Sequence, residues 1–208
     1  MAIILLRHGE TALNAARVMQ PADTPLSERG RAQARAVAAR LARRGGIGAV
    51  LSSDLPRTRL TAETVAAALA LPVETSARLQ ERNFGELRGR PYDTLGFDPL
   101  VMAQAPPGGE SADEFAQRVQ RAFDEMLQRH AALAADLLVV THGLVIRALL
   151  GGPLRAGAAG LAALAGLHLG NTSLSIFDAA PPYAVQLLNC TAHLDGGERD
   201  DAQALSGG

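Results

Sequence analysis

The sequence predicts an α/β protein, a three-layer α/β/α sandwich with a mostly parallel central sheet. Several short runs are almost wholly apolar, among them Ile3–Leu6, Ala49–Leu51 and Leu137–Thr141. Strands that are buried on both faces, as in parallel sheets covered by helices, have this composition. Segments with helical periodicity separate the runs, and this alternation is typical of a parallel sheet with helices on both sides.

Capping signals mark where these helices begin. Ser27 is a favoured N-cap residue, and Ser111 with Glu114 forms a capping box. Pro56 fits the first turn of another helix, which the Ser and Asp residues just before it would cap. The expected helices cover residues 28–44, 56–69, 112–130 and 143–150, and the remaining strands cover residues 72–75, 174–177 and 184–188.

Two segments are expected to be irregular. Residues 12–26 should form a rim segment, because prolines discourage a long helix there. Residues 77–110, named the lid segment below, are rich in Arg, Gly and Pro and should pass over the edge of the sheet, covering the site. With no internal repeat or linker visible, we expect one domain over residues 1–195 and a disordered tail over residues 196–208.

The composition of the chain limits which binding partners and which cellular location we expect. The formal net charge of −1 gives no electrostatic case for binding nucleic acid or an acidic membrane surface. The single cysteine, Cys190, cannot form an intrachain disulfide, and no Cys/His spacing resembles a zinc site. Neither a signal peptide nor a membrane span is recognisable, so we expect a cytoplasmic protein. The oligomeric state stays open, with a homodimer as one option.

Two of the predicted strands end in the same way. Arg7 and His8 follow the first apolar run, and His142 follows the run over residues 137–141. If these strands are neighbours, both histidines reach one crevice at the edge of the sheet, where Arg57 on a strand-to-helix turn would join them. Arginine forks and helix N-termini suit a phosphate dianion, and a neutral histidine can attack phosphorus in line. A small phosphorylated substrate is therefore expected.

The run from Arg7 to Thr11, Arg-His-Gly-Glu-Thr, resembles the signature of the histidine phosphatase superfamily, also called phosphoglycerate mutase-like. Other motifs fall in the order of that family: Asn14, Pro25-Leu26-Ser27 with Gly30, Ser52-Ser53-Asp54 with Arg57-Thr58, Glu81 with Phe84-Gly85, Pro107-Gly108-Gly109-Glu110-Ser111, His142-Gly143, Asn189 and His193-Leu194. The resemblance runs from residue 3 to about residue 194 and implies the phosphoglycerate mutase-like form of the sandwich.

The resemblance also implies a role for each matching residue. His8 would be the nucleophile that becomes phosphohistidine. Glu81 would protonate the leaving group and then activate water as a base. The phosphoryl group would be held by a set of polar residues: Arg7, Asn14, Arg57, His142 and Gly143. No metal or other cofactor is implied, since arginines and histidines would supply the positive charge.

Other assignments stay open. Glu63, Glu74 and Glu86 compete with Glu81 in sequence, although Glu81 matches the family position. Gln20 and Leu144 are additional candidates for the pocket, because both stand where the family pattern changes. His193 either approaches the site or completes a strand, and His130 and His168 are interpreted as structural.

The predicted activity is that of a metal-independent phosphomonoester hydrolase. Phosphoglycerate mutases of this family carry a lysine and an arginine pair for the substrate carboxylate, but this chain has no lysine and residues 91–110 contain no basic residue. A cofactor-dependent mutase is the first alternative. A non-catalytic phospholigand-binding protein on the same fold is the second. Apolar residues of the lid segment, such as Leu95 and Phe97, favour a partly apolar leaving group.

Overall fold

A computed structural model describes residues 1–154 and 168–194 of the chain. Its strands form one six-stranded sheet in the order β3-β2-β4-β1-β5-β6. They cover Ala2–Arg7 (β1), Ile47–Ser52 (β2), Val73–Thr75 (β3), Asp136–Thr141 (β4), Leu174–Asp178 (β5) and Val185–Cys190 (β6). The first four pair in parallel, whereas β5 and β6 are antiparallel. The mostly parallel sheet predicted from the sequence is confirmed.

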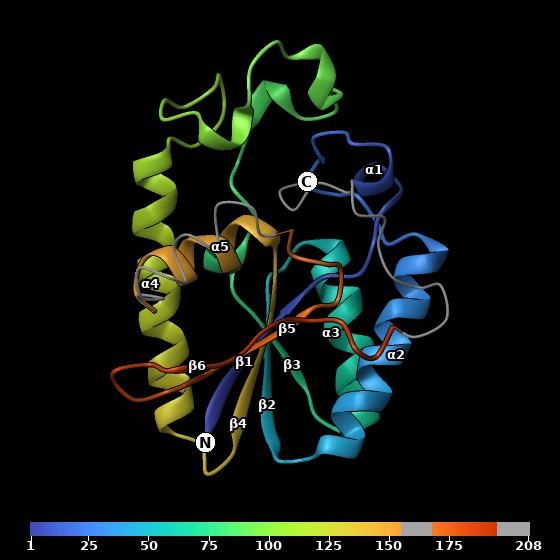
Figure 1. The fold of residues 1–208 in the computed structure, drawn as a ribbon, viewed down its shortest axis with the longest axis vertical. Coiled ribbons are helices and arrows are strands. Elements are labelled where there is room, and N and C mark those ends of the chain that lie inside the picture. Colours follow the sequence, from blue (N-terminus) through green and yellow to red (C-terminus); the bar gives the residue numbers. More distant parts are fainter. Residues whose placement is uncertain (155–167, 195–208) are drawn as a thin grey trace.

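Helices cover both faces of this sheet (Figure 1). On one side lie α2 (Glu28–Arg44) and α3 (Pro56–Leu69), and on the other lie α4 (Ala112–Ala131) and α5 (Gly143–Gly151). Alternate residues of β1 and β4 pack into two separate apolar clusters, one beneath each helical layer. Because both faces are covered, the central strands β1 and β4 are apolar except at their end residues, which is the pattern that predicted the three-layer sandwich.

The capping signals are observed at two of the three helices. Ser27 accepts a hydrogen bond from the amide of Gly30, and the capping box of Ser111 with Glu114 is formed. The expected cap of α3 is wrong: Leu55 occupies the N-cap without a side-chain hydrogen bond. Pro56 at the first helical position removes one amide that would need a partner, so α3 starts without a capping side chain.

The rim segment is also less irregular than expected. It begins with a short helix, α1 (Ala12–Ala15), which Thr11 and Asn14 close with a reciprocal capping box. The prolines of the rim lie beyond this turn. A Thr three residues before an Asn is a local capping signal, but the four residues of α1 are too few to show an apolar period.

Two glycines allow α2 to approach the chain that leaves β1. A side-chain carbon on Gly30 would lie 2.0 Å from the carbonyl oxygen of Glu10, and one on Gly9 would lie 2.5 Å from the carbonyl oxygen of Gly30. Any larger residue would push these backbones apart. The contact fixes the position of the turn that follows His8.

The lid segment contains four short 3-10 helices: Ala77–Leu79, Gly85–Leu87, Tyr92–Thr94 and Pro99–Val101. Figure 1 shows its green ribbon beyond the ends of β1 and β4. Phe84, Tyr92 and Leu95 are buried in the same apolar cluster as α4 and α5. No helix among residues 1–154 and 168–194 is long and apolar enough to span a membrane. The predicted tail lies outside the described residues.

Candidate active site

The two histidines meet at the edge of the sheet where β1 and β4 end. Arg7 pairs with Thr141 in the parallel register, so His8 and His142 follow at the same level. Their ring centroids are 5.2 Å apart, with an interplanar angle of 61°, and both residues are fully buried. The amide of His8 also donates to the carbonyl of Thr141 at 3.0 Å. The structure thus brings together the pair that the strand ends predicted.

The ring of His8 is oriented by its own backbone neighbour. Its Nδ1 lies 2.7 Å from the carbonyl oxygen of Gly9, and a carbonyl only accepts, so Nδ1 carries the proton. Burial, and then the guanidinium groups of Arg57 and Arg7, hold the pKa of His8 well below its ordinary value of 6.5. The neutral ring therefore has a lone pair on Nε2, and this atom has no hydrogen-bond partner among the described residues.

His142 is held from the neighbouring strand. Its Nε2 lies 3.0 Å from the hydroxyl of Ser53, whose amide in turn donates to the carbonyl of Val140 at 2.9 Å. Burial first, then Arg57 and His8, lower the pKa of His142 well below 6.5. Its Nδ1 lacks a hydrogen-bond partner within the part of the chain that is described.

Arg7 and Arg57 bring two buried positive charges to the histidines. Arg7 donates to the carbonyl of Leu169, and Arg57 donates to the carbonyls of Pro21 and Ala22 at 3.3 Å each. Burial lowers the pKa of Arg57 to about 10, although the Glu81 carboxylate opposes the shift. Arg57 remains charged at neutral pH, and no salt bridge to a carboxylate is formed by it among the described residues. A buried guanidinium in this state favours an anionic ligand.

Glu81 is the buried carboxyl group of the site, 5% exposed. Its two oxygens accept hydrogen bonds from the amides of Arg82 at 3.1 Å and Leu144 at 3.2 Å. Burial raises its pKa above 4.5, while the Leu144 amide and Arg57 act in the opposite direction. A carboxyl group with a raised pKa can hold a proton closer to neutral pH, as a general acid requires.

The competing glutamates lie elsewhere. Glu63 pairs with Arg59 on the exposed side of α3, and Glu74 pairs with Arg129. The side chain of Glu86 is exposed to solvent. Of the four candidates, only Glu81 is buried beside the two arginines.

Two amide side chains complete the polar cluster. The oxygen of Asn14 accepts from the amide of Thr11 at 3.2 Å and from the Nδ2 of Asn171 at 3.4 Å. The oxygen of Gln20 accepts from the hydroxyl of Thr11 at 2.7 Å. These donors fix both amides with their oxygens engaged, and the nitrogen of each is buried without a partner among the described residues. Asn171 also donates to the carbonyl of His8 at 2.9 Å.

The other candidates contribute differently. Gly143 begins α5, and Leu144 contributes its backbone amide to Glu81 rather than its side chain. The ring nitrogens of His193 lie 3.3 Å from Arg40 and 3.0 Å from the hydroxyl of Thr172. His193 is thus seated behind the turn that carries Asn171.

Three residues near the site were missed as site residues in the sequence. Ser53 lay in a recognised motif but had no role assigned, and Asn171 sits in a polar Asn-Thr-Ser run before β5 that could have drawn attention. Tyr92 of the lid segment is buried, and burial followed by the Glu81 carboxylate raises its pKa. Nothing in the local sequence marks Tyr92.

Several buried polar atoms therefore lack partners among the described residues: His8 Nε2, His142 Nδ1, Arg57 Nε, Asn14 Nδ2 and Gln20 Nε2. Folded proteins satisfy most of their buried polar groups, so a group of such atoms indicates a ligand. The arginine and amide nitrogens are donors, which suits an anion. Among residues 1–154 and 168–194, no group of three or more His, Cys, Asp or Glu side chains is placed to hold a metal ion.

Comparisons with known proteins agree with this geometry. A probable phosphoglycerate mutase, GpmB, of Yersinia pestis is 37% identical over 219 residues, covering 97% of this chain and 98% of that protein. The structure of a mycobacterial glucosyl-3-phosphoglycerate phosphatase matches with a TM-score of 0.76 and 28% identity, covering 91% of this chain and 98% of that one. Bacillus stearothermophilus YhfR matches with a TM-score of 0.80 and 28% identity, covering 93% and 99%.

The structural matches confirm the predicted phosphoglycerate mutase-like fold. The family model described as "Histidine phosphatase superfamily (branch 1)" matches residues 3–190, which include both strand ends and the segment that carries Glu81. This chain therefore belongs to the histidine phosphatase superfamily.

Proposed function

We propose that this chain is a metal-independent phosphomonoester hydrolase that acts through a phosphohistidine at His8. One observation carries the proposal: a neutral buried histidine presents an unpartnered Nε2 beside two buried arginines and a carboxyl group of raised pKa. A nucleophile, a positively charged cradle and a proton donor are the three parts that phosphoryl transfer from an ester requires.

In the first step, the lone pair on Nε2 of His8 attacks phosphorus in line with the leaving oxygen. The bond between phosphorus and that oxygen breaks, and protonated Glu81 gives its proton to the departing alkoxide. The ring then carries phosphate on Nε2 and a proton on Nδ1, so it is positively charged. The carbonyl of Gly9, which already accepts from Nδ1, stabilises this cation.

In the second step, the Glu81 carboxylate takes a proton from water, and the water oxygen attacks phosphorus. The bond between phosphorus and Nε2 breaks, inorganic phosphate leaves, and both His8 and Glu81 return to their starting forms. Arg7, Arg57 and His142 would hold the equatorial oxygens in both steps. The charge on these oxygens is met by groups that are already fixed by hydrogen bonds to the protein.

The leaving group is proposed to be partly apolar. A cavity of about 290 Å³ lies along the lid segment, lined by Tyr92, Phe97, Pro99 and Leu100 together with Arg17 and two aspartates. Tyr92, which lines this cavity, is close enough to Glu81 for the carboxylate to raise the pKa of Tyr92. An alcohol with an apolar portion would fit this lining.

Phosphoglycerate mutase is the second candidate, favoured by the 37% identity to the Yersinia relative. A mutase must retain an acidic substrate and return the phosphoryl group to it. The chain has no lysine, and in the lid segment Arg78 pairs with Glu125 while Arg82 donates to the carbonyls of Glu110 and Gln104. These two arginines are engaged, whereas Arg88 of the lid segment lies close enough to Arg57 to lower the pKa of Arg57. We propose water as the acceptor of the phosphoryl group because the chain has no lysine to hold a substrate carboxylate.

Phosphate release from a panel of phosphate esters tests the proposal. The purified chain should turn over p-nitrophenyl phosphate in the presence of EDTA, and His8→Ala should abolish this activity. A brief incubation with labelled substrate should trap a phosphoprotein that is stable in base and labile in acid, as a phosphorus–nitrogen bond is. Equal rates for the native chain and His8→Ala would refute the enzyme assignment. Rapid conversion of 3-phosphoglycerate in the presence of 2,3-bisphosphoglycerate, without phosphate release, would establish the mutase instead.

A further inference from the structure

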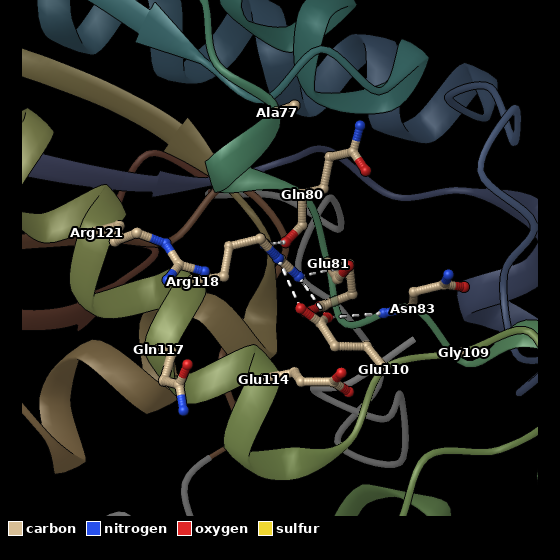
Figure 2. A pocket seen from close by; sticks show the side chains of 10 residues that line it. All are labelled: Ala77, Gln80, Glu81, Asn83, Gly109, Glu110, Glu114, Gln117, Arg118 and Arg121. Atoms are coloured by element: carbon tan, nitrogen blue, oxygen red, sulfur yellow. Dashed lines mark hydrogen bonds and ion pairs between the residues drawn. The ribbon is translucent and has the colours of Figure 1, made fainter.

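Arg118 on α4 directs its hydrogen-bond donors at the backbone of residues 78–81 and at the carboxylate of Glu110. Figure 2 shows its side chain beside Gln80, Glu81 and Glu110. Its Nη1 donates to the carbonyls of Arg78 at 2.9 Å and Gln80 at 2.7 Å, and its Nη2 donates to that of Glu81 at 3.4 Å. The remaining two donors form a bidentate pair with Glu110, at 2.8 and 2.7 Å. A guanidinium has five N–H groups, and each is engaged here.

Glu110 holds the same stretch from the other side. Its carboxylate accepts from the amide of Asn83 at 3.3 Å, and its own amide donates to the carbonyl of Asn83 at 2.8 Å. Its carbonyl accepts from the Nε of Arg82 at 3.1 Å. The pair of Arg118 and Glu110 therefore binds the backbone on both sides of Glu81, at residues 78–81 and at residue 83.

This pair is not an ordinary surface salt bridge. The side chains of Arg118 and Glu110 are only 17% and 14% exposed, and Arg118 also packs over the ring of Phe115 at 5.2 Å. Exposed ion pairs contribute little to stability because solvent screens them. A mostly buried pair whose hydrogen bonds are directed at a single loop fixes the location of that loop.

The loop in question carries the carboxyl group. Glu81 reaches across to the amide of Leu144 at the start of α5, and this hydrogen bond depends on where the backbone of residue 81 lies. Proton transfer needs the acid within hydrogen-bond reach of the leaving oxygen, and a misplacement of about 1 Å can cost about a hundredfold in rate. The backbone anchors at residues 78, 80, 81 and 83 fix that placement.

We propose that Arg118, together with Glu110, is a positioning residue for Glu81 in the transfer of the phosphoryl group. The inference rests on the proposed function, because it assigns a partner to the proposed proton donor. This positioning role requires the planar guanidinium of arginine, since the ammonium group of a lysine at this position could donate to only some of the five acceptors.

Comparing esters with different leaving groups distinguishes a positioning role of Arg118 from a merely structural one. p-Nitrophenolate departs as a stable anion and needs little help from an acid, whereas the alkoxide of benzyl phosphate needs a proton as it leaves. A displaced Glu81 should therefore reduce kcat/KM for benzyl phosphate more than for p-nitrophenyl phosphate. Loss of fold or of phosphate affinity would reduce both alike.

The test compares kcat/KM for these two esters in Arg118→Met, Arg118→Lys and Glu110→Gln. We expect the loss on benzyl phosphate to exceed the loss on p-nitrophenyl phosphate by about tenfold or more in each, as for a partly disabled general acid. Arg121→Met is the matched control. Arg121 lies on the same helix as Arg118 and lines with it the cavity of about 470 Å³ drawn in Figure 2, and no hydrogen bond described for this chain joins Arg121 to residues 78–83. The ratio of kcat/KM for benzyl phosphate to kcat/KM for p-nitrophenyl phosphate should stay at the native value in Arg121→Met.

Equal losses on the two esters, or no loss, in a variant with a native unfolding transition would overturn the inference. If Arg118→Met does not fold, Arg118→Lys and Glu110→Gln supply the same comparison. The proposed function has its own criterion, the loss of all activity in His8→Ala. If that criterion holds and the ester ratio does not change, only the positioning role falls.

Discussion

Lowering the pH should destabilise this protein through His8 and His142, which are held neutral in its interior. In the unfolded chain each histidine takes up a proton at its ordinary pKa near 6.5, whereas burial and the neighbouring arginines keep the folded pKa of both well below that value. The unfolded state therefore binds more protons as the pH falls below 6.5, and stability is lost in that direction.

The magnitude follows from the two buried rings. If both stay neutral in the folded state, each costs about 1.4 kcal/mol of unfolding free energy between about pH 7.5 and about pH 5.5, and the pair costs about 2.7 kcal/mol. Glu81 acts in the opposite sense: its raised pKa lets the folded state take up a proton first, so it restores some stability below its folded pKa. The pH dependence measured on the native chain alone is therefore the sum of the histidine and Glu81 contributions.

Variants isolate the histidine contribution. Urea unfolding at both pH values measures how much unfolding free energy each protein loses on acidification. For His8→Gln and for His142→Gln this loss should be about 1.4 kcal/mol smaller than for the native chain, and for the double variant about 2.7 kcal/mol smaller. Packing changes caused by glutamine are the same at both pH values and cancel in the difference. A double variant with the native pH dependence would refute the view that these rings are neutral when folded.

Three further outcomes follow from the site. Glu81→Gln should lower kcat/KM for benzyl phosphate by about 10²- to 10⁴-fold, with a smaller loss on p-nitrophenyl phosphate; a uniform loss would argue against a proton donor. Asn171→Ala should lower kcat/KM by about tenfold to a hundredfold, because Asn171 donates to Asn14 and to the carbonyl of His8, and it should also lower Tm, because Asn171 is fully buried. Gly30→Ala should cost about 1–3 kcal/mol in urea unfolding, since its Cβ would meet the backbone of Glu10 at 2.0 Å, and unchanged stability would contradict the close approach.

The parts of the fold that the sequence predicts well are those with a short-range cause. Apolar runs at β1 and β4 reflect burial on both faces, and the capping box at Ser111 is a contact between residues three apart. His8 and His142 are far apart in the chain, but each follows the end of a recognisable strand, and parallel neighbouring strands end at one edge of a sheet. Where the local signal was ambiguous, as at the cap of α3, the prediction was wrong.

The supporting residues could not be predicted in this way, because their contacts join distant parts of the chain. Arg118 reaches back 40 residues to the carbonyl of Arg78, and Asn171 reaches back 163 residues to the carbonyl of His8. Both bind backbone carbonyls, which every residue possesses, so nothing in the sequence of the accepting segment indicates a partner. The reactive residues at the strand ends can be predicted from the sequence because specific side chains carry out the chemistry. The placement of that chemistry is encoded by side chains whose targets have no sequence signature, and mutations at those positions should reveal how much of the activity depends on placement.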